Sequence, residues 1–245
     1  DSLGTVQETP VTGNVLLNDT DLENNTLTAS VLTATANGTL QLNSNGSFTY
    51  TPSDGFTGVD EATYRACDAG ACDTALLVFT VAPPPESPVI GAAMTVDKPA
   101  YQADGAYRAM FTIRLRNYGD TRLLQVKAID NLPGAFPAPA SFRVVSVHAD
   151  AGLIVNSAFN GVNDSSLLAA GSTLEVGETG TITLVTDIIP NGNFGPFNNR
   201  ATAHAVTPLG KTVNDISSEG INPDPNGNAN PGDTGEDTPT PVDLE

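Results

Sequence analysis

The sequence predicts an all-β protein made of two tandem β-sandwich domains and an acidic C-terminal extension. Apolar and polar residues alternate with a period of two in segments such as 106–117, where Tyr107, Phe111 and Leu115 share one face, as in a half-buried strand. Turns that need positive φ are indicated by Asn-Gly pairs at 37–38, 45–46, 160–161 and 191–192. No segment shows the periodicity of an amphipathic helix of three turns.

The domain boundaries follow from a proline-rich break. The segment "PPPESP" at residues 83–88 is a stiff, extended spacer of the kind that separates domains, and 245 residues suit two ordinary domains. The expected parts are a sandwich at 1–82, a linker at 83–88, a second sandwich at 89–220 and an acidic extension at 221–245. No signal peptide is present, and the final Leu244-Glu245 resembles a cloning scar, so we expect a piece of a longer protein.

Composition and charge narrow the function classes. Hydrophobic residues make up 39% of the chain, enough for a core, while only 16% are charged. The 28 acidic and 10 basic residues give a net charge of -18, which repels nucleic acid and anionic lipid and suits divalent cations or a saline medium. No stretch approaches the roughly 20 apolar residues of a membrane span. We therefore expect no nucleic-acid partner and no membrane insertion.

Three stretches of the first segment occur in an order typical of one family. They are "TPVTGNVLLNDTDLENNTLTA" (9–29), "NGTLQLNSNGSFTYTPSDGFTGVDEATYRACD" (37–68) and "CDTALLVFTV" (72–81). This pattern resembles the cadherin-like, bacterial-immunoglobulin-type repeats that build long secreted adhesins and surface proteins. The resemblance covers nearly all of residues 1–82. It implies an immunoglobulin-like β-sandwich, strung end to end with similar domains and often rigidified by calcium, in agreement with the short strands and frequent turns.

A calcium site is expected in the stretch "NDTDLE". Its oxygen donors are Asn18, Asp19, Asp21 and Glu23. Calcium takes six to eight such oxygens, and no basic residue lies nearby in the sequence to neutralise them. Asp60, from a distant loop, and Glu8, a weaker candidate, could add donors. The alternative is a solvated turn in which Asp and Asn bond their own backbone.

Two cysteines predict a disulfide. Cys67 and Cys72 frame "DAGA", and in a hairpin with a four-residue loop they would face each other within bridging reach. Two cysteines in a chain of exported character favour a bridge. The alternative is a pair of reduced thiols, since the spacing excludes a CxxC redox or zinc motif.

The second segment resembles another group of surface proteins. The stretches "GAYRAMFTIRLRNYGDTRLLQVKAIDNLPGAF", "SLLAAGSTLEVGETGTITL" and "NNRATA" are similar to the conserved-repeat domains of bacterial surface proteins, a domain class of unknown function. The resemblance covers about 90–241. It implies an immunoglobulin-like sandwich used as a stalk unit, with the tail as the acidic connector that often follows such a domain.

Strand parity in this segment raises the possibility of an internal crosslink. Lys98, Asp130 and Asn199 each fall on the apolar face of a different predicted strand. Burial would lower the pKa of the lysine and raise that of the aspartate, so that a neutral amine attacks the Asn199 carboxamide while the acid transfers protons. The product would be an autocatalytic isopeptide bond. The alternative is that Lys98, before Pro99, reaches water at a strand end while Asp130 and Asn199 serve turns and backbone.

The tail "INPDPNGNANPGDTGEDTPTP" at 221–241 admits two interpretations. Its acidity and few apolar residues favour a disordered, solvated linker, and its prolines exclude a helix or a central strand. Asp and Asn alternate in it as donors do in calcium loops, although Gly235 stands where an EF-hand needs a bidentate Glu. We expect the tail to fold back on the second domain around at least one calcium. The expected ligands are Asp224, Asn226, Asn228 and Asp233, with Asp215 or Glu219 joining from the preceding strand.

These patterns favour a structural function over an enzymatic one. No nucleophile elbow, phosphate loop or defensible carboxylate pair is present, so no catalytic residue is assigned. We expect a calcium-stabilised stalk segment of a large secreted or surface-anchored bacterial adhesin, with neighbouring repeats as partners and a cell-surface protein or polysaccharide as a conceivable target. The alternative is a carbohydrate-binding accessory module of a secreted polysaccharide-active protein, which the absence of Trp and the 6% of aromatic residues weaken. A third reading is that the acidity reflects only a saline habitat.

Overall fold

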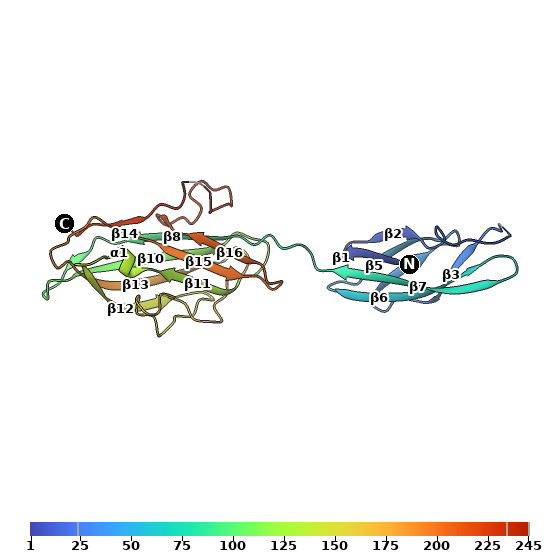
Figure 1. Cartoon of the computed structure of the whole chain (residues 1–245), viewed down its shortest axis with the longest axis horizontal. Helices are drawn as coiled ribbons and strands as arrows, with labels where there is room; N and C mark the ends of the chain where they lie inside the picture. The colour runs from blue at the N-terminus through green and yellow to red at the C-terminus, as the bar shows by residue number, and fades with distance from the viewer. Residues whose placement is uncertain (24, 234, 245) are drawn as a thin grey trace. The chain divides into compact units, whose positions relative to one another are not determined.

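The chain consists of two compact units, Asp1–Pro85 and Glu86–Glu245, in a computed structural model that describes residues 1–23, 25–233 and 235–244. Each unit is built from β-strands (Figure 1), and the predicted all-β class is confirmed. Over the described residues the one helix is α1 (Leu132–Ala135), a single turn capped by Asn131. None of the described helices is long and apolar enough to cross a membrane.

The first unit is a sandwich of two sheets. One sheet has the order β1-β7-β6-β3 and the other β2-β5-β4. Their strands are β1 (Ser2–Val6), β2 (Val11–Asn14), β3 (Thr28–Thr33), β4 (Gly38–Leu42), β5 (Ser47–Pro52), β6 (Gly58–Cys67) and β7 (Cys72–Ala82). Aromatic side chains join the sheets, because Tyr50 of β5 stacks on Phe79 of β7 with ring centroids 3.9 Å apart and Phe48 meets the same ring edge-on.

Three of the four Asn-Gly pairs named above make the predicted turns. Gly46, Gly161 and Gly192 all have positive φ, the conformation that glycine adopts without steric cost. Gly38 differs, because it begins β4 instead of a turn. A Cβ atom there would lie 2.3 Å from the Tyr50 ring, so this glycine is required by a close packing contact.

The β6–β7 hairpin carries the disulfide. Cys67 and Cys72 are opposite each other in the strand register, their Cα atoms are 4.1 Å apart, and the bridge closes the turn at residues 68–71. The predicted pairing is present in the structure, and it fixes the end of the hairpin where β6 leaves the sheet.

The second unit has one large sheet packed against smaller ones. The large sheet has the order β12-β13-β10-β8-β17, with β9 also paired to β10, and the smaller sheets are β11-β15-β16 and β14-β18. The strands are β8 (Ile90–Val96), β9 (Ala100–Tyr101), β10 (Tyr107–Asn117), β11 (Leu124–Asp130), β12 (Ser141–Ala149), β13 (Thr179–Ile189), β14 (Phe197–Asn199), β15 (Ala201–Val206), β16 (Thr212–Ile216), β17 (Ser218–Glu219) and β18 (Thr240–Val242).

The alternation read from residues 106–117 is that of β10. Phe111, Ile113 and Leu115 are fully buried in the core between the sheets, whereas Arg108 and Met110 face away from it. β10 pairs along its length with β13 on one side and β8 on the other, so this strand organises the large sheet.

Both ends of the second unit extend further than the sequence-based boundaries. Glu86 of the expected linker accepts a hydrogen bond from the Thr207 hydroxyl, and the Ser87 N–H donates to Asp120 Oδ1 at 2.8 Å, so these residues belong to the second unit. The acidic extension supplies β18, and Val242 and Leu244 are buried in the core. Of the expected cloning scar, Glu245 lies outside the described residues.

Replacing Cys67 and Cys72 with serine is expected to lower the free energy of unfolding of the first unit by about 2 kcal/mol, because the bridge closes a short loop and removes little entropy from the unfolded chain. Urea unfolding followed by circular dichroism measures this loss. Intact mass of the unreduced protein should be two hydrogens below the sequence mass, and the full reduced mass would contradict the bridge.

Candidate metal-binding site

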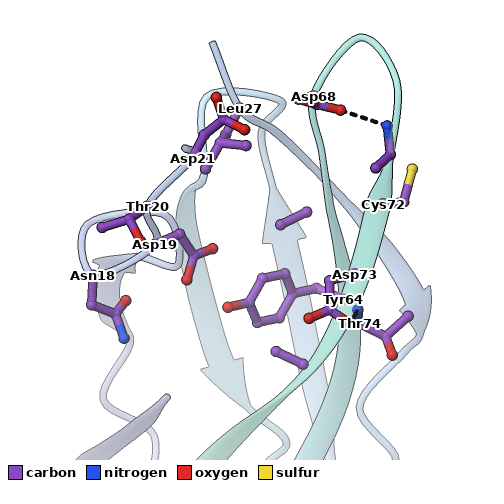
Figure 2. A pocket seen from close by; sticks show the side chains of 13 residues that line it. Asn18, Asp19, Thr20, Asp21, Leu27, Tyr64, Asp68, Cys72, Asp73 and Thr74 are labelled. Atoms are coloured by element: carbon purple, nitrogen blue, oxygen red, sulfur yellow. Dashed lines mark hydrogen bonds between the residues drawn. The ribbon is translucent and has the colours of Figure 1, made fainter. Parts of the chain in front are cut away.

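A polar pocket lies at one end of the first unit, between the loop after β2 and the β6–β7 hairpin. Figure 2 shows Asp19 and Asp21 on the loop side of this pocket, Asp68 and Asp73 on the hairpin side, and the Tyr64 hydroxyl pointing into the space between them. The hollow measures about 440 Å³, enough for an ion together with water molecules. Two segments far apart in the sequence therefore bring their carboxylates to one place.

Two of these acidic side chains, Asp21 and Asp68, come close to a third acid, Glu23, which lies beside the pocket lining. Asp21, Glu23 and Asp68 each place one carboxylate oxygen within 4.8 Å of the others. Asp21 and Glu23 belong to the predicted "NDTDLE" cluster, whereas sequence reasoning missed Asp68. The turn closed by the disulfide brings Asp68 here, and its position next to Cys67 was the available signal.

The local backbone holds two of these carboxylates in place. Asp68 Oδ1 accepts hydrogen bonds from the N–H groups of Gly70 and Ala71, and Asp21 Oδ1 accepts one from Asn25 N–H at 2.6 Å. The bonds from Ala71 and Gly70 lower the pKa of Asp68, because they stabilise its charged form. Asp68 is therefore a preoriented anion at the mouth of the pocket.

The other predicted donors of the loop also line this pocket. Asn18 and Asp19 are both among its lining residues. Burial raises the pKa of Tyr64, and the negative charge of Asp19 raises it further. The Tyr64 hydroxyl donates to Asp1 Oδ2 at 2.8 Å and also lies 3.2 Å from the Val15 carbonyl oxygen. It is thus a neutral donor among acidic groups.

Comparison with known proteins identifies this unit. Residues 1–83 match the family model described as a bacterial cadherin-like domain. The first unit is therefore similar to bacterial cadherin-like domains. The expected resemblance is confirmed over almost the same residues. No curated protein matches the chain.

Solved structures share only distant similarity with the whole chain. The endo-fucoidan hydrolase MfFcnA4 of glycoside hydrolase family 107, as its H294Q variant, is 11% identical with a TM-score of 0.28, over 90% of this chain and 28% of that one. The major pilin subunit BcpA of Bacillus cereus is 8% identical with a TM-score of 0.36, over 78% and 63%. Protocadherin gamma B7 is 14% identical with a TM-score of 0.25, over 80% and 40%. The chain thus spans less than a third of the hydrolase, and at these TM-scores no property of these proteins is transferred to it.

The expected contribution of Asp60 to the metal site is wrong. Asp60 is buried near the start of β6, whereas the pocket lies at the other end of that strand. Its carboxylate accepts hydrogen bonds from the N–H groups of Ala36 and Asn37 and from the Tyr50 hydroxyl, each at 2.9 Å. Asp60 therefore stabilises a backbone turn and a core tyrosine of the cadherin-like domain. Glu8 is exposed in the turn between β1 and β2 and does not line the pocket.

The predicted ligands of the tail fall into two groups. Asp215 and Asp224 are each only 3% exposed. Burial raises the pKa of Asp215 to about 7, helped by the negative charges of Asp237 and Glu236. Glu236 and Asp237 are acidic neighbours that the ligand prediction omitted.

The remaining predicted ligands belong to a surface turn. Asn226 and Asn228 are exposed and Asp233 is half-buried. The Asn228 side chain donates to Asp233 Oδ2 at 2.6 Å, and Asn226 Oδ1 accepts from Asn228 N–H at 2.9 Å. Glu219, in β17, is exposed as well. These groups bond one another or face solvent, as Asx-rich turns do.

The three residues of the expected isopeptide bond lie in different surroundings. Asp130 and Asn199 are buried on different strands as predicted, and Asn199 Nδ2 donates to Asp130 Oδ2 at 2.9 Å. Lys98, however, is exposed beyond the end of β8, where Pro99 follows it, so its amine keeps its hydration. Asp130 and Asn199 instead form a buried polar pair.

Asp130→Asn is expected to flatten the pH dependence of the stability of the second unit. Burial raises the pKa of Asp130 to about 7, so the folded state binds a proton that the unfolded state loses near pH 4. This contribution is complete below about pH 4 and is lost as pH rises to about 7, with a total on the order of 1 to 4 kcal/mol. Urea unfolding of both proteins from pH 4 to 8 measures the difference, and parallel curves would contradict the raised pKa.

Proposed function

We propose that this chain is a structural, calcium-stabilised stalk segment of a large secreted or surface-anchored bacterial adhesin. The observation that carries the proposal is the group formed by Asp21, Glu23 and Asp68 at the end of a bacterial cadherin-like domain. Its neighbours in the stalk would be further repeats of the same chain. The Cys67–Cys72 bridge supports an extracellular location, because disulfides persist in oxidising compartments.

The donor set formed by Asp21, Glu23 and Asp68 fits calcium. Carboxylate oxygens are the hard ligands that calcium prefers, and three of them lie within 4.8 Å of one another. Arg65 is the single Lys or Arg between residues 1 and 85, and none of the ion pairs found over the described residues involves the three acids. A divalent cation would relieve the repulsion between them.

The position of the site explains how an ion would stiffen the domain. The loop that carries Asp21 and Glu23 runs from β2 of one sheet to β3 of the other, while Asp68 lies at the tip of the β6–β7 hairpin. An ion held by all three would fasten this crossover to the hairpin end. Pulling the sheets apart would then require breaking metal–oxygen contacts in addition to the core, which suits a load-bearing spacer.

A second candidate function rests on an aromatic cluster in the second unit. Tyr101 is 67% exposed and Phe194 47% exposed, and both rings contact Tyr107 with centroids 5.4 and 6.3 Å away. Exposed aromatic rings are common contact surfaces for sugars, so this cluster favours the carbohydrate-binding alternative.

Affinity electrophoresis against a panel of bacterial and algal polysaccharides tests this alternative. Retardation that Tyr101→Ala abolishes, while Leu209→Ala at another exposed apolar position preserves it, would support a carbohydrate-binding module. Unchanged mobility with every polysaccharide would favour the stalk.

Calcium is expected to protect the pocket of the cadherin-like domain and to raise its melting temperature, because a metal bound only by the native state stabilises it by mass action. Amide exchange of the full chain, in calcium and in chelator, should show slower exchange at residues 18–23 and 68–72 with calcium. Magnesium should do less, since it demands strict octahedral geometry. Asp68→Asn should weaken the effect at least tenfold.

Asp54→Asn is the matched control, because Asp54 is an exposed aspartate of the same domain that does not line the pocket. It should respond to calcium as the unaltered chain does. Identical exchange at both pocket segments in calcium and in chelator would contradict the calcium-stabilised function.

A further inference from the structure

The C-terminal segment at residues 221–239, here called the strap, is fastened at both ends to the second unit. Before it, β17 runs parallel to β8, and the Ser218 hydroxyl lies 3.5 Å from the Ala92 carbonyl oxygen. After it, β18 pairs with β14, and the Thr240 hydroxyl donates to the Met94 carbonyl at 3.0 Å. The strap is therefore part of the fold and lies close to β8.

Four acidic side chains beneath and within the strap are half-buried or almost fully buried. Asp215 and Asp224 are 3% exposed, Glu236 is 7% exposed and Asp237 is half-buried. Each keeps one buried oxygen that has no hydrogen-bond donor. These oxygens are Asp215 Oδ1, Asp224 Oδ1, Glu236 Oε2 and Asp237 Oδ1.

Backbone N–H groups hold the second oxygen of three of these side chains. Asp215 Oδ2 accepts from Ala92 N–H at 2.7 Å, which ties this carboxylate to β8. Asp224 Oδ2 accepts from Ala229 N–H at 2.9 Å, and Glu236 Oε1 from Asn226 N–H at 3.2 Å, so both are held by turns of the strap. The carboxylates are thus oriented, and each leaves one oxygen for another partner.

Close packing shows that the strap lies against Asp215 and β8. A Cβ atom on Gly232 would be 3.9 Å from Asp215 Oδ1, and one on Gly91 would be 3.0 Å from Pro223. The charges of Glu236 and Asp237 act on Asp215, and those of Asp224 and Glu236 act on Tyr118. The strap thus packs against β8 next to Asp215, and its acids influence both Asp215 and Tyr118.

No basic side chain among the described residues pairs with this group. The ion pairs found there involve Arg108, Arg122 and Arg143 with other acids. Arg114 donates to the Ile221 carbonyl at 3.4 Å and not to a carboxylate. Arg116 stacks over the Tyr118 ring at 4.9 Å and forms no ion pair with these acids among those found. Because each buried ion without a partner costs several kcal/mol, a bound cation would relieve that cost.

We propose that Asp215, Asp224, Glu236 and Asp237 form a calcium site that fastens the strap to β8. Four carboxylates supply hard oxygens for a cation that takes six to eight, leaving places for carbonyl groups or water. The irregular strap suits calcium better than magnesium, which requires a near-ideal octahedron. The site lies in the second unit, uses no residue of the cadherin-like pocket, and does not depend on that pocket binding metal.

Under this proposal, the strap is well ordered only when calcium is bound. With the ion removed, the carboxylates of the strap repel one another and Asp215 across a poorly hydrated space. The segment between β17 and β18 then gains freedom, although its two ends stay tied to the sheets. The strap would be ordered in calcium-rich extracellular fluid and loosened in chelator.

Terbium luminescence of the full chain distinguishes the two proposed sites. Terbium replaces calcium at oxygen sites and is excited through nearby tyrosine, and this chain has five Tyr and no Trp. Tyr118→Phe should remove most of the emission from the strap site, whereas Tyr64→Phe should remove emission from the cadherin-like pocket only. Loss in one variant without the other shows which site binds.

Calcium competition and amide exchange then test the ligands. Asp215→Asn and Glu236→Gln should each weaken calcium displacement of the strap signal at least tenfold and speed amide exchange at 222–233 in calcium. Asp233→Asn is the matched control on the strap and should stay within twofold of the unaltered chain. Equal strap exchange in calcium and in chelator, together with unchanged terbium emission in Tyr118→Phe, would overturn the proposal.

Discussion

The whole structure is constrained by a shortage of basic side chains. Its buried carboxylates must be stabilised although there are too few Lys and Arg residues to pair with them. With 28 acidic and 10 basic residues, most acids cannot be neutralised by Lys or Arg, and those that are buried must be stabilised in other ways. Three kinds of solution appear in the fold. Asp187 pairs with Arg108 and Arg143, which lower its pKa. Asp60 is surrounded by backbone N–H groups and a tyrosine hydroxyl. Asp130 shares a hydrogen bond with Asn199.

The acids that remain occur where separate segments of the chain must be held together. In the cadherin-like domain they lie where a crossover loop approaches the tip of a disulfide-closed hairpin. In the second unit Asp215 accepts a hydrogen bond from β8, and the other acids lie on the strap. Each unit thus keeps acidic side chains that form none of the ion pairs found over the described residues. A divalent cation bound at either place would connect these segments, as the proposed stalk function requires.

The two groups of acids differ in how firmly they are prepared for an ion. Asp21, Glu23 and Asp68 are half-buried or exposed, so water screens their repulsion and the apo pocket costs little. Asp215, Asp224 and Glu236 are nearly inaccessible, and each has an oxygen without a donor. The strap site therefore has more to gain from an ion than the pocket, because desolvated charges interact more strongly.

Local patterns in the sequence determined the all-β class, the alternation of β10, three of the four predicted Asn-Gly turns and the Cys67–Cys72 hairpin, because each depends on residues close together in the chain. Residues 18–23 were likewise identified as an acidic loop from their own side-chain types.

Tertiary structure decided which acidic residues come together. Asp68 comes to that loop through the pairing of β6 with β7, and Asp60 is carried to the other end of β6. Lys98 fell on the expected face by parity, but β8 ends before it, so its side chain remains in water. In the tail, composition located the acidic residues, yet burial against β8 selected Asp215, Asp224 and Glu236 and left Asn226 and Asn228 in solvent. Burial depends on contacts between distant segments, which a reading of local sequence does not contain.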